Sequence, residues 1–109
     1  MGATKIRTVE STGVKLAEKC KEITKYDCSE PTWTTHQDRD EIAPPAGTVA
    51  IVVDLRNAWG SIRIYQTQND DYVDMVGMDE KKNLVIVPWQ DDWTYLCTGS
   101  PQVGCVMKK

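Results

Sequence analysis

The chain lacks most of the residues and motifs on which enzymes commonly depend. Its 109 residues include a single histidine, His36. There is no Gly-x-Ser-x-Gly, no serine beside a histidine and no glycine-rich loop that could hold a phosphate. We therefore expect no catalytic set, no metal site and no cofactor, and we predict that the protein is not an enzyme.

Signals for a membrane or for nucleic acid are also missing. No stretch approaches the ~20 apolar residues of a membrane-spanning helix. Lysine and arginine total 13 against 16 aspartates and glutamates, a net charge of −3. Nucleic-acid binding usually leaves a dense basic patch in the sequence, and none is present. We expect neither a membrane span nor a nucleic-acid partner.

The four cysteines are the clearest indication of a compartment. Cys20 and Cys28 lie near the start of the chain, and Cys97 and Cys105 lie near its end. Four cysteines in a small domain are typical of two disulfides formed in an oxidising compartment, so we predict disulfides and secretion. Both spacings are wider than those of the usual zinc sites. All three connectivities stay open, and we favour bridges between the two ends because they close the longest loops.

Export has no direct signal in the sequence. Residues 1–25 are charged throughout and do not resemble a secretory signal peptide, so secretion would imply a leader that has been removed. The chain also has no Asn-x-Ser/Thr glycosylation site.

The first quarter of the chain favours a helix. Leu16, Cys20 and Ile23 follow one another at helical spacing, with charged residues between them. We therefore assign residues 1–27 to an N-terminal helical segment and residues 28–109 to a disulfide-stabilised β domain.

From residue 48 onward the pattern is that of β-strands. Residues 48–55 form a continuous apolar run, typical of a buried central strand. Residues 61–67 alternate, with Ile62 and Ile64 on one face and Arg63 and Tyr65 on the other. Further strands are predicted at 72–78, 83–89 and 93–98, and a short edge strand is predicted earlier in the chain at 29–35. The turns are predicted at 56–60, 68–71, 79–82 and 90–92, and a loop at 99–104. The pattern predicts a mainly β protein: a meander folded into a small antiparallel β-sandwich or barrel of about five to six strands, with an N-terminal helix.

Aromatic residues are the candidate binding residues, because tryptophan and tyrosine are favoured at interaction hot spots. If 83–89 and 93–98 pair as a hairpin, Trp89 and Trp93 face each other across the strands, and Asp91 and Asp92 are turn residues. Two exposed indoles beside two carboxylates could instead form a carbohydrate-stacking or partner-binding patch. The candidate binding residues are Trp33, Trp59, Tyr65, Tyr72, Trp89 and Trp93.

The run His-Gln-Asp-Arg-Asp-Glu at 36–41 is the other candidate site. His36, Asp38 and Asp40 share one face of an extended segment and could hold a divalent cation or serve a hydrolase. The glycine and spaced oxygen ligands of a calcium loop are missing. We interpret this run as a solvated loop.

The size of the chain, the strands from Thr48 to Cys97 and the paired cysteines resemble the small cysteine-bridged effector and toxin-like proteins of plant-pathogenic fungi. The nearest pattern is that of the MAX-type effectors, which implies a compact β-sandwich with a cysteine bridge. The long gap from Cys28 to Cys97 and the helical lead depart from that pattern, and no functional residue carries over. Secreted proteinase and amylase inhibitors share the same outline.

We therefore predict a secreted, disulfide-stabilised, monomeric binding protein. It would contact a host or target protein, as an effector, virulence factor or toxin-like protein. The alternatives are a small secreted hydrolase or ribonuclease that uses His36 with Asp38 or Asp40, a secreted enzyme inhibitor, and a cytosolic scaffold with reduced thiols.

Overall fold

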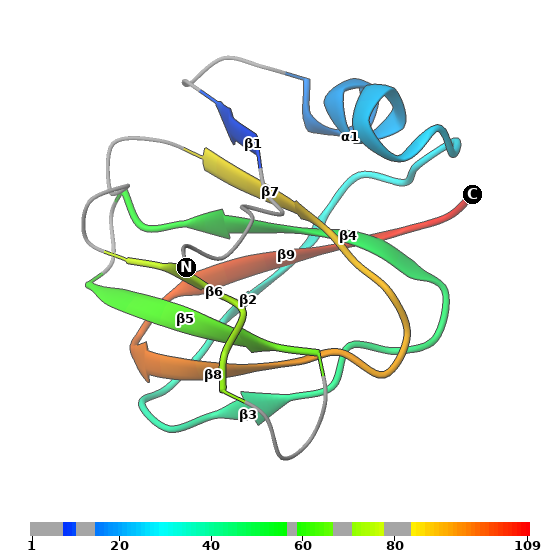
Figure 1. Cartoon of the computed structure of the whole chain (residues 1–109). Coiled ribbons are helices and arrows are strands. Elements are labelled where there is room, and N and C mark those ends of the chain that lie inside the picture. The colour runs from blue at the N-terminus through cyan, green and yellow to red at the C-terminus, as the bar shows by residue number, and fades with distance from the viewer. Residues whose placement is uncertain (1–7, 11–14, 57–58, 67–70, 78–83) are drawn as a thin grey trace.

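The computed structural model describes residues 8–10, 15–56, 59–66, 71–77 and 84–109 (Figure 1). Two antiparallel sheets pack face to face, and one helix lies on the outside of one of them. The predicted fold class, an antiparallel β-sandwich with an N-terminal helix, is confirmed. The described part contains nine strands, more than expected, because several are only two or three residues long.

The first sheet has five strands in the order β1–β7–β4–β9–β2. Its strands are β1 (Thr8–Glu10), β7 (Leu84–Pro88), β4 (Thr48–Asp54), β9 (Gln102–Met107) and β2 (Thr32–Thr35). The second sheet has four strands in the order β3–β8–β5–β6. Its strands are β3 (Glu41–Ile42), β8 (Thr94–Gly99), β5 (Gly60–Tyr65) and β6 (Asp74–Val76).

The predicted helix is present as α1 (Leu16–Thr24), and it covers the outer face of the first sheet (Figure 1). Cys20 is buried there against Val52 and Ile86, with Leu16 and Ile23 packed at the margin. The inner face of β4 carries Ile51 and Val53 into the layer between the sheets. Strand β4 is apolar along its length because both of its faces are covered, as its sequence predicted.

The predicted meander is wrong. Of the strands that follow one another in the chain, only β5 and β6 lie side by side in the same sheet. Strands β1 and β2 lie at opposite edges of the first sheet, and every later step except β5 to β6 passes from one sheet to the other. The predicted hairpin of 83–89 with 93–98 does not form, because β7 pairs with β1 and β4 whereas β8 pairs with β3 and β5. Alternation along a strand indicates which face is buried, but it does not identify the strand's neighbour.

The loop predicted at 99–104 is also wrong, because Gly99 belongs to β8 and residues 102–104 belong to β9. This strand lies between β4 and β2, in the interior of the first sheet. Its Gly104 hides the strand in the sequence, since glycine is depleted in strands. A Cβ at Gly104 would lie 2.7 Å from Cβ of Pro31, so the absent side chain makes room for the segment leading into β2.

Several expectations fall wholly or partly outside the described residues, namely the turns predicted at 56–60, 68–71 and 79–82. In the described segments, α1 is nine residues long, and no helix there has the length and apolar character needed to cross a bilayer.

Candidate functional site

The two indoles of the Trp-Gln-Asp-Asp-Trp run meet at the corner where the chain passes from β7 to β8. Trp89 is 6% exposed and belongs to the core between the sheets. Its ring contacts that of Trp93 edge to face at 5.4 Å and that of Tyr95 at 5.9 Å. Trp89 is therefore a core residue, and Trp93, which is half-buried, holds the corner in place.

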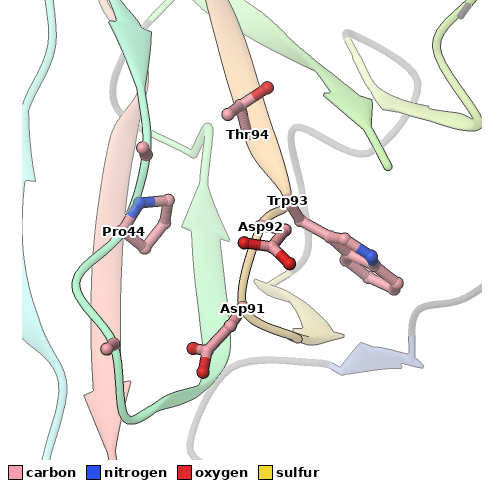
Figure 2. Close-up of a pocket in the computed structure, with 7 residues that line it drawn as sticks. Pro44, Asp91, Asp92, Trp93 and Thr94 are labelled. Atoms are coloured by element: carbon pink, nitrogen blue, oxygen red, sulfur yellow. The ribbon is translucent and has the colours of Figure 1, made fainter. Parts of the chain in front are cut away.

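A cleft of about 380 Å³ opens beside this corner, between residues 43–46 and 91–94. Figure 2 shows Asp91 and Asp92 across from Pro44, with the Trp93 indole directed away from Pro44. Asp92 has a φ of 77°, so it serves the backbone turn. The lining contains no histidine, cysteine or cation, and the two carboxylates are exposed. General acid–base catalysis needs a shaped, partly desolvated site, which these aspartates do not have.

His36 is buried, and its interpretation as part of a solvated loop is wrong. Its side chain is 7% exposed, and Nε2 lies 2.7 Å from the hydroxyl oxygen of Tyr95. Its Nδ1 lies 3.4 Å from a carboxylate oxygen of Asp40. Asp38 points elsewhere, because its Oδ1 accepts a hydrogen bond from the backbone N–H of Gly99 at 2.9 Å.

This cluster fastens the loop before β3 to β8. Burial raises the pKa of Tyr95 above its ordinary value, so its hydroxyl stays neutral and can share a hydrogen bond with His36. The backbone N–H of Cys97 donates to the carbonyl of Asp40 at 2.7 Å, which joins the same two segments. Within the part of the chain that is described, no three histidine, cysteine or acidic side chains are placed to hold a metal ion. His36 is thus buried, and both of its ring nitrogens lie close to partners within the fold.

The four cysteines are free thiols in the structure, so the predicted disulfides are not present. Cys20 and Cys28 share the cluster beneath α1, on the outer face of the first sheet. Cys97 lies between the sheets, and Cys105 points the same way, because its strand neighbour Ile51 faces that layer. A disulfide requires Cα atoms within ~7 Å. The first sheet separates the two pairs, so the favoured bridges between the chain ends do not fit this fold.

The outer face of the second sheet gathers aromatic and amphipathic side chains. Ile62 and Ile64 point inward, so Arg63 and Tyr65 point outward, as the sequence predicted. Met75 and Leu96 are the strand neighbours of Arg63 on either side.

Tyr72 completes this group. It is 46% exposed, its ring contacts that of Tyr65 edge to face at 6.5 Å, and the guanidinium of Arg63 lies 5.5 Å from its centroid. We call this set of side chains the tyrosine face: Arg63, Tyr65, Tyr72, Met75 and Leu96.

A hollow of about 170 Å³ lies beside the tyrosine face. It is lined by Tyr65, Leu96, Thr94 and Glu41, so it has an aromatic and aliphatic floor with one carboxylate at its rim. Glu41 is the strand neighbour of Leu96 across the β3–β8 pair.

The other two predicted binding residues lie apart from the tyrosine face. Trp59 is 64% exposed and precedes β5, with its ring over Gly99 at the end of β8. Trp33 is 43% exposed and lies on β2, with its indole over Gly104. The structure thus brings together Tyr65 with Tyr72 and Trp89 with Trp93, and it separates Trp33 and Trp59 from both pairs. Sequence reasoning did not select Arg63, Met75, Leu96 or Glu41, although strand alternation placed Arg63 beside Tyr65.

No protein-family model matches the chain, and neither a curated protein nor a solved structure matches it. The resemblance to cysteine-bridged effectors therefore stays a prediction, and any function has to be argued from the surfaces themselves.

Proposed function

We propose that this protein is a binding protein that recognises another protein through the tyrosine face. A single observation carries the proposal: two tyrosines, a methionine and an arginine gather, all exposed except the partly buried Tyr65, on a sheet face that no described element covers. The helix lies on the opposite side of the sandwich (Figure 1).

The composition of this face supports the proposal. Tyrosine, methionine and arginine are enriched in protein–protein interfaces, whereas lysine, glutamate and aspartate are depleted. The centre of the tyrosine face follows this pattern, with Arg63 as its only charged member. Tyrosine also offers a large rigid contact area at a low cost in conformational entropy.

The contacts among these side chains hold Tyr72 in place before any partner binds. Its ring is packed against Tyr65 on one side and lies beneath the guanidinium of Arg63. Cation–π contacts at exposed sites contribute ~0.5–1 kcal/mol. A side chain that is already ordered loses less freedom on binding, which raises affinity.

The hollow beside Tyr65 indicates the kind of group that a partner would insert. Its volume of about 170 Å³ suits one side chain, and Glu41 places a negative charge at the rim. A lysine or arginine could lay its aliphatic stem on Tyr65 and Leu96 and pair with Glu41. We therefore infer a partner that presents a basic side chain in an otherwise apolar patch.

Secretion, and a role as an effector, toxin or inhibitor, are part of this proposal. They are supported by the small size of the chain, which is typical of such proteins. Fractionation of the source organism tests export directly. The protein is expected in the extracellular fraction, and protein confined to the cells would remove this part of the proposal.

Affinity capture tests the binding function. The immobilised protein is exposed to extracts of the source organism and of the organisms that it contacts, and captured proteins are identified by mass spectrometry. A hot-spot residue contributes at least ~2 kcal/mol, so Tyr72→Ala should weaken binding of the captured partner more than about tenfold. Arg63→Glu should do the same.

Thr98→Ala is the matched control, because Thr98 is exposed on the same sheet but outside the tyrosine face. It should bind as the unmodified chain does. Equal binding by all variants would show that the partner uses another surface.

A further inference from the structure

The four strands at the edges of the two sheets are not equally protected against pairing with a strand of another chain. Strand β3 has two residues and includes Glu41, and β6 has three and begins at Asp74. Strand β1 has three residues. Natural proteins shorten edge strands and place charges on them to prevent pairing with another chain. Strand β2 has four residues, Thr-Trp-Thr-Thr, all exposed and none charged.

The hydrogen bonds of β2 show which of its residues face the free edge. The backbone N–H of His36 donates to the carbonyl of Pro101, which sets the hydrogen-bonded positions of the β2–β9 ladder. Thr34 and Thr32, which alternate with His36, face β9 in the same way. Trp33 and Thr35 therefore direct their backbone N–H and C=O groups away from the sheet, where no described strand pairs with them.

We propose that two copies of the chain associate through this edge, with their β2 strands antiparallel about a two-fold axis at Thr34. In that register Trp33 of each copy exchanges backbone hydrogen bonds with Thr35 of the other. Each indole then packs beside a threonine on the same face, a favourable cross-strand pair. The association joins two five-stranded sheets into one.

The free edge of β2 fits a second copy as its occupant, because the backbone groups that it presents are their own complement. Trp33 and Thr35 each direct one N–H and one C=O outward, and an antiparallel second copy satisfies all of them. No residue of β2 carries a charge that would oppose this pairing. The exposed Arg39 that follows the strand lies beside a carboxylate of its own chain, with its Nε 3.9 Å from Asp38. The dimer replaces the monomer expected from the sequence, and it leaves the tyrosine face, on the other sheet, free.

Sedimentation velocity on the full chain tests the dimer from ~10 µM to ~1 mM, because so short an interface is expected to be weak. The mass should rise from 12.3 kDa toward twice that value with concentration. Thr34→Lys alone and Thr34→Glu alone should remain monomeric, since each places like charges directly opposite one another at the axis. An equimolar mixture of the two variants should associate at least about tenfold more tightly than either alone.

Thr98→Lys is the control, because it adds the same charge at an exposed threonine of the other sheet. It should associate as the unmodified chain does, and circular dichroism should show that every variant is folded. A chain that stays monomeric at ~1 mM would overturn the proposal. Association that persists in Thr34→Lys, or a mixture that fails to associate, would overturn it as well. Because Tyr72→Ala leaves β2 unchanged, it should keep the dimer even where it loses the captured partner.

Discussion

Replacing Trp89 with alanine should remove a large part of the stability of this domain. The indole is 6% exposed and contacts Trp93 and Tyr95 edge to face. An aromatic side chain buries ~150–250 Å², and substituting a buried tryptophan with alanine typically costs ~3–5 kcal/mol. A small domain has ~5–15 kcal/mol in total. Trp93→Ala should cost less, about 1–2 kcal/mol, because Trp93 is half-buried and loses mainly the ring contact.

Urea unfolding followed by far-ultraviolet circular dichroism measures both free energies without depending on tryptophan emission. The midpoint of Trp89→Ala should fall further than that of Trp93→Ala, and the double variant should be less destabilised than the sum, because the two rings share a contact. A cost below ~1 kcal/mol for Trp89→Ala would refute its place in the core. Equal losses of unfolding free energy in the two variants would refute the assignment of Trp89 to the core and of Trp93 to its margin.

Three further perturbations follow from the fold. Gly99→Ala should cost ~1–3 kcal/mol in urea unfolding, because Gly99 has a φ of 73° and a Cβ there would lie 2.5 Å from the Trp59 ring; an unchanged midpoint would contradict this. Arg56→Met should cost about 1–2 kcal/mol at neutral pH, because the hydrogen bonds from Arg56 stabilise the ionised Asp54 and lower its pKa. This stability is lost as the pH falls through the lowered pKa, so the free energies of unfolding of the two proteins should converge in acid. A difference that stays constant with pH would contradict the pairing. Burial raises the pKa of Cys97 from 9.0 to about 12, so its alkylation at pH 8 should be about a thousandfold slower in the folded than in the unfolded chain. The free energy of unfolding should also decline as the pH rises above 9, because the thiol then ionises in the unfolded chain. Alkylation of the folded chain at the unfolded rate would contradict the burial of Cys97.

A helix or a buried strand could be predicted from the sequence where the spacing of apolar residues within one segment is sufficient to indicate it. Helix α1 follows from the spacing of Leu16, Cys20 and Ile23, and the burial of β4 from its unbroken apolar run. Strand pairing could not be predicted, because the sequences of β7 and β8 are equally compatible with a hairpin and with two strands in different sheets. Only the long-range contacts of each strand decide between these arrangements.

The candidate site was predictable to a smaller degree. Alternation placed Arg63 and Tyr65 together on one side of their strand, which accounts for two of the five side chains of the tyrosine face. The contact of Tyr72 with Arg63 joins a residue that precedes β6 to one on β5, and no local pattern indicates it. The burial of His36 also depends on a distant residue, Tyr95, 59 positions away in the chain. A polar run around a lone histidine reads as a solvated loop until its partner is known.

Hydroxyl-radical footprinting of the protein with its captured partner tests the central claim most directly, because side-chain oxidation follows solvent exposure and methionine is readily oxidised. The proposed function predicts that oxidation of Tyr72 and Met75 falls when the partner binds, while that of Trp59, which is 64% exposed and outside the tyrosine face, is unchanged. Protection of Trp59 with no change at Tyr72 and Met75 would contradict it.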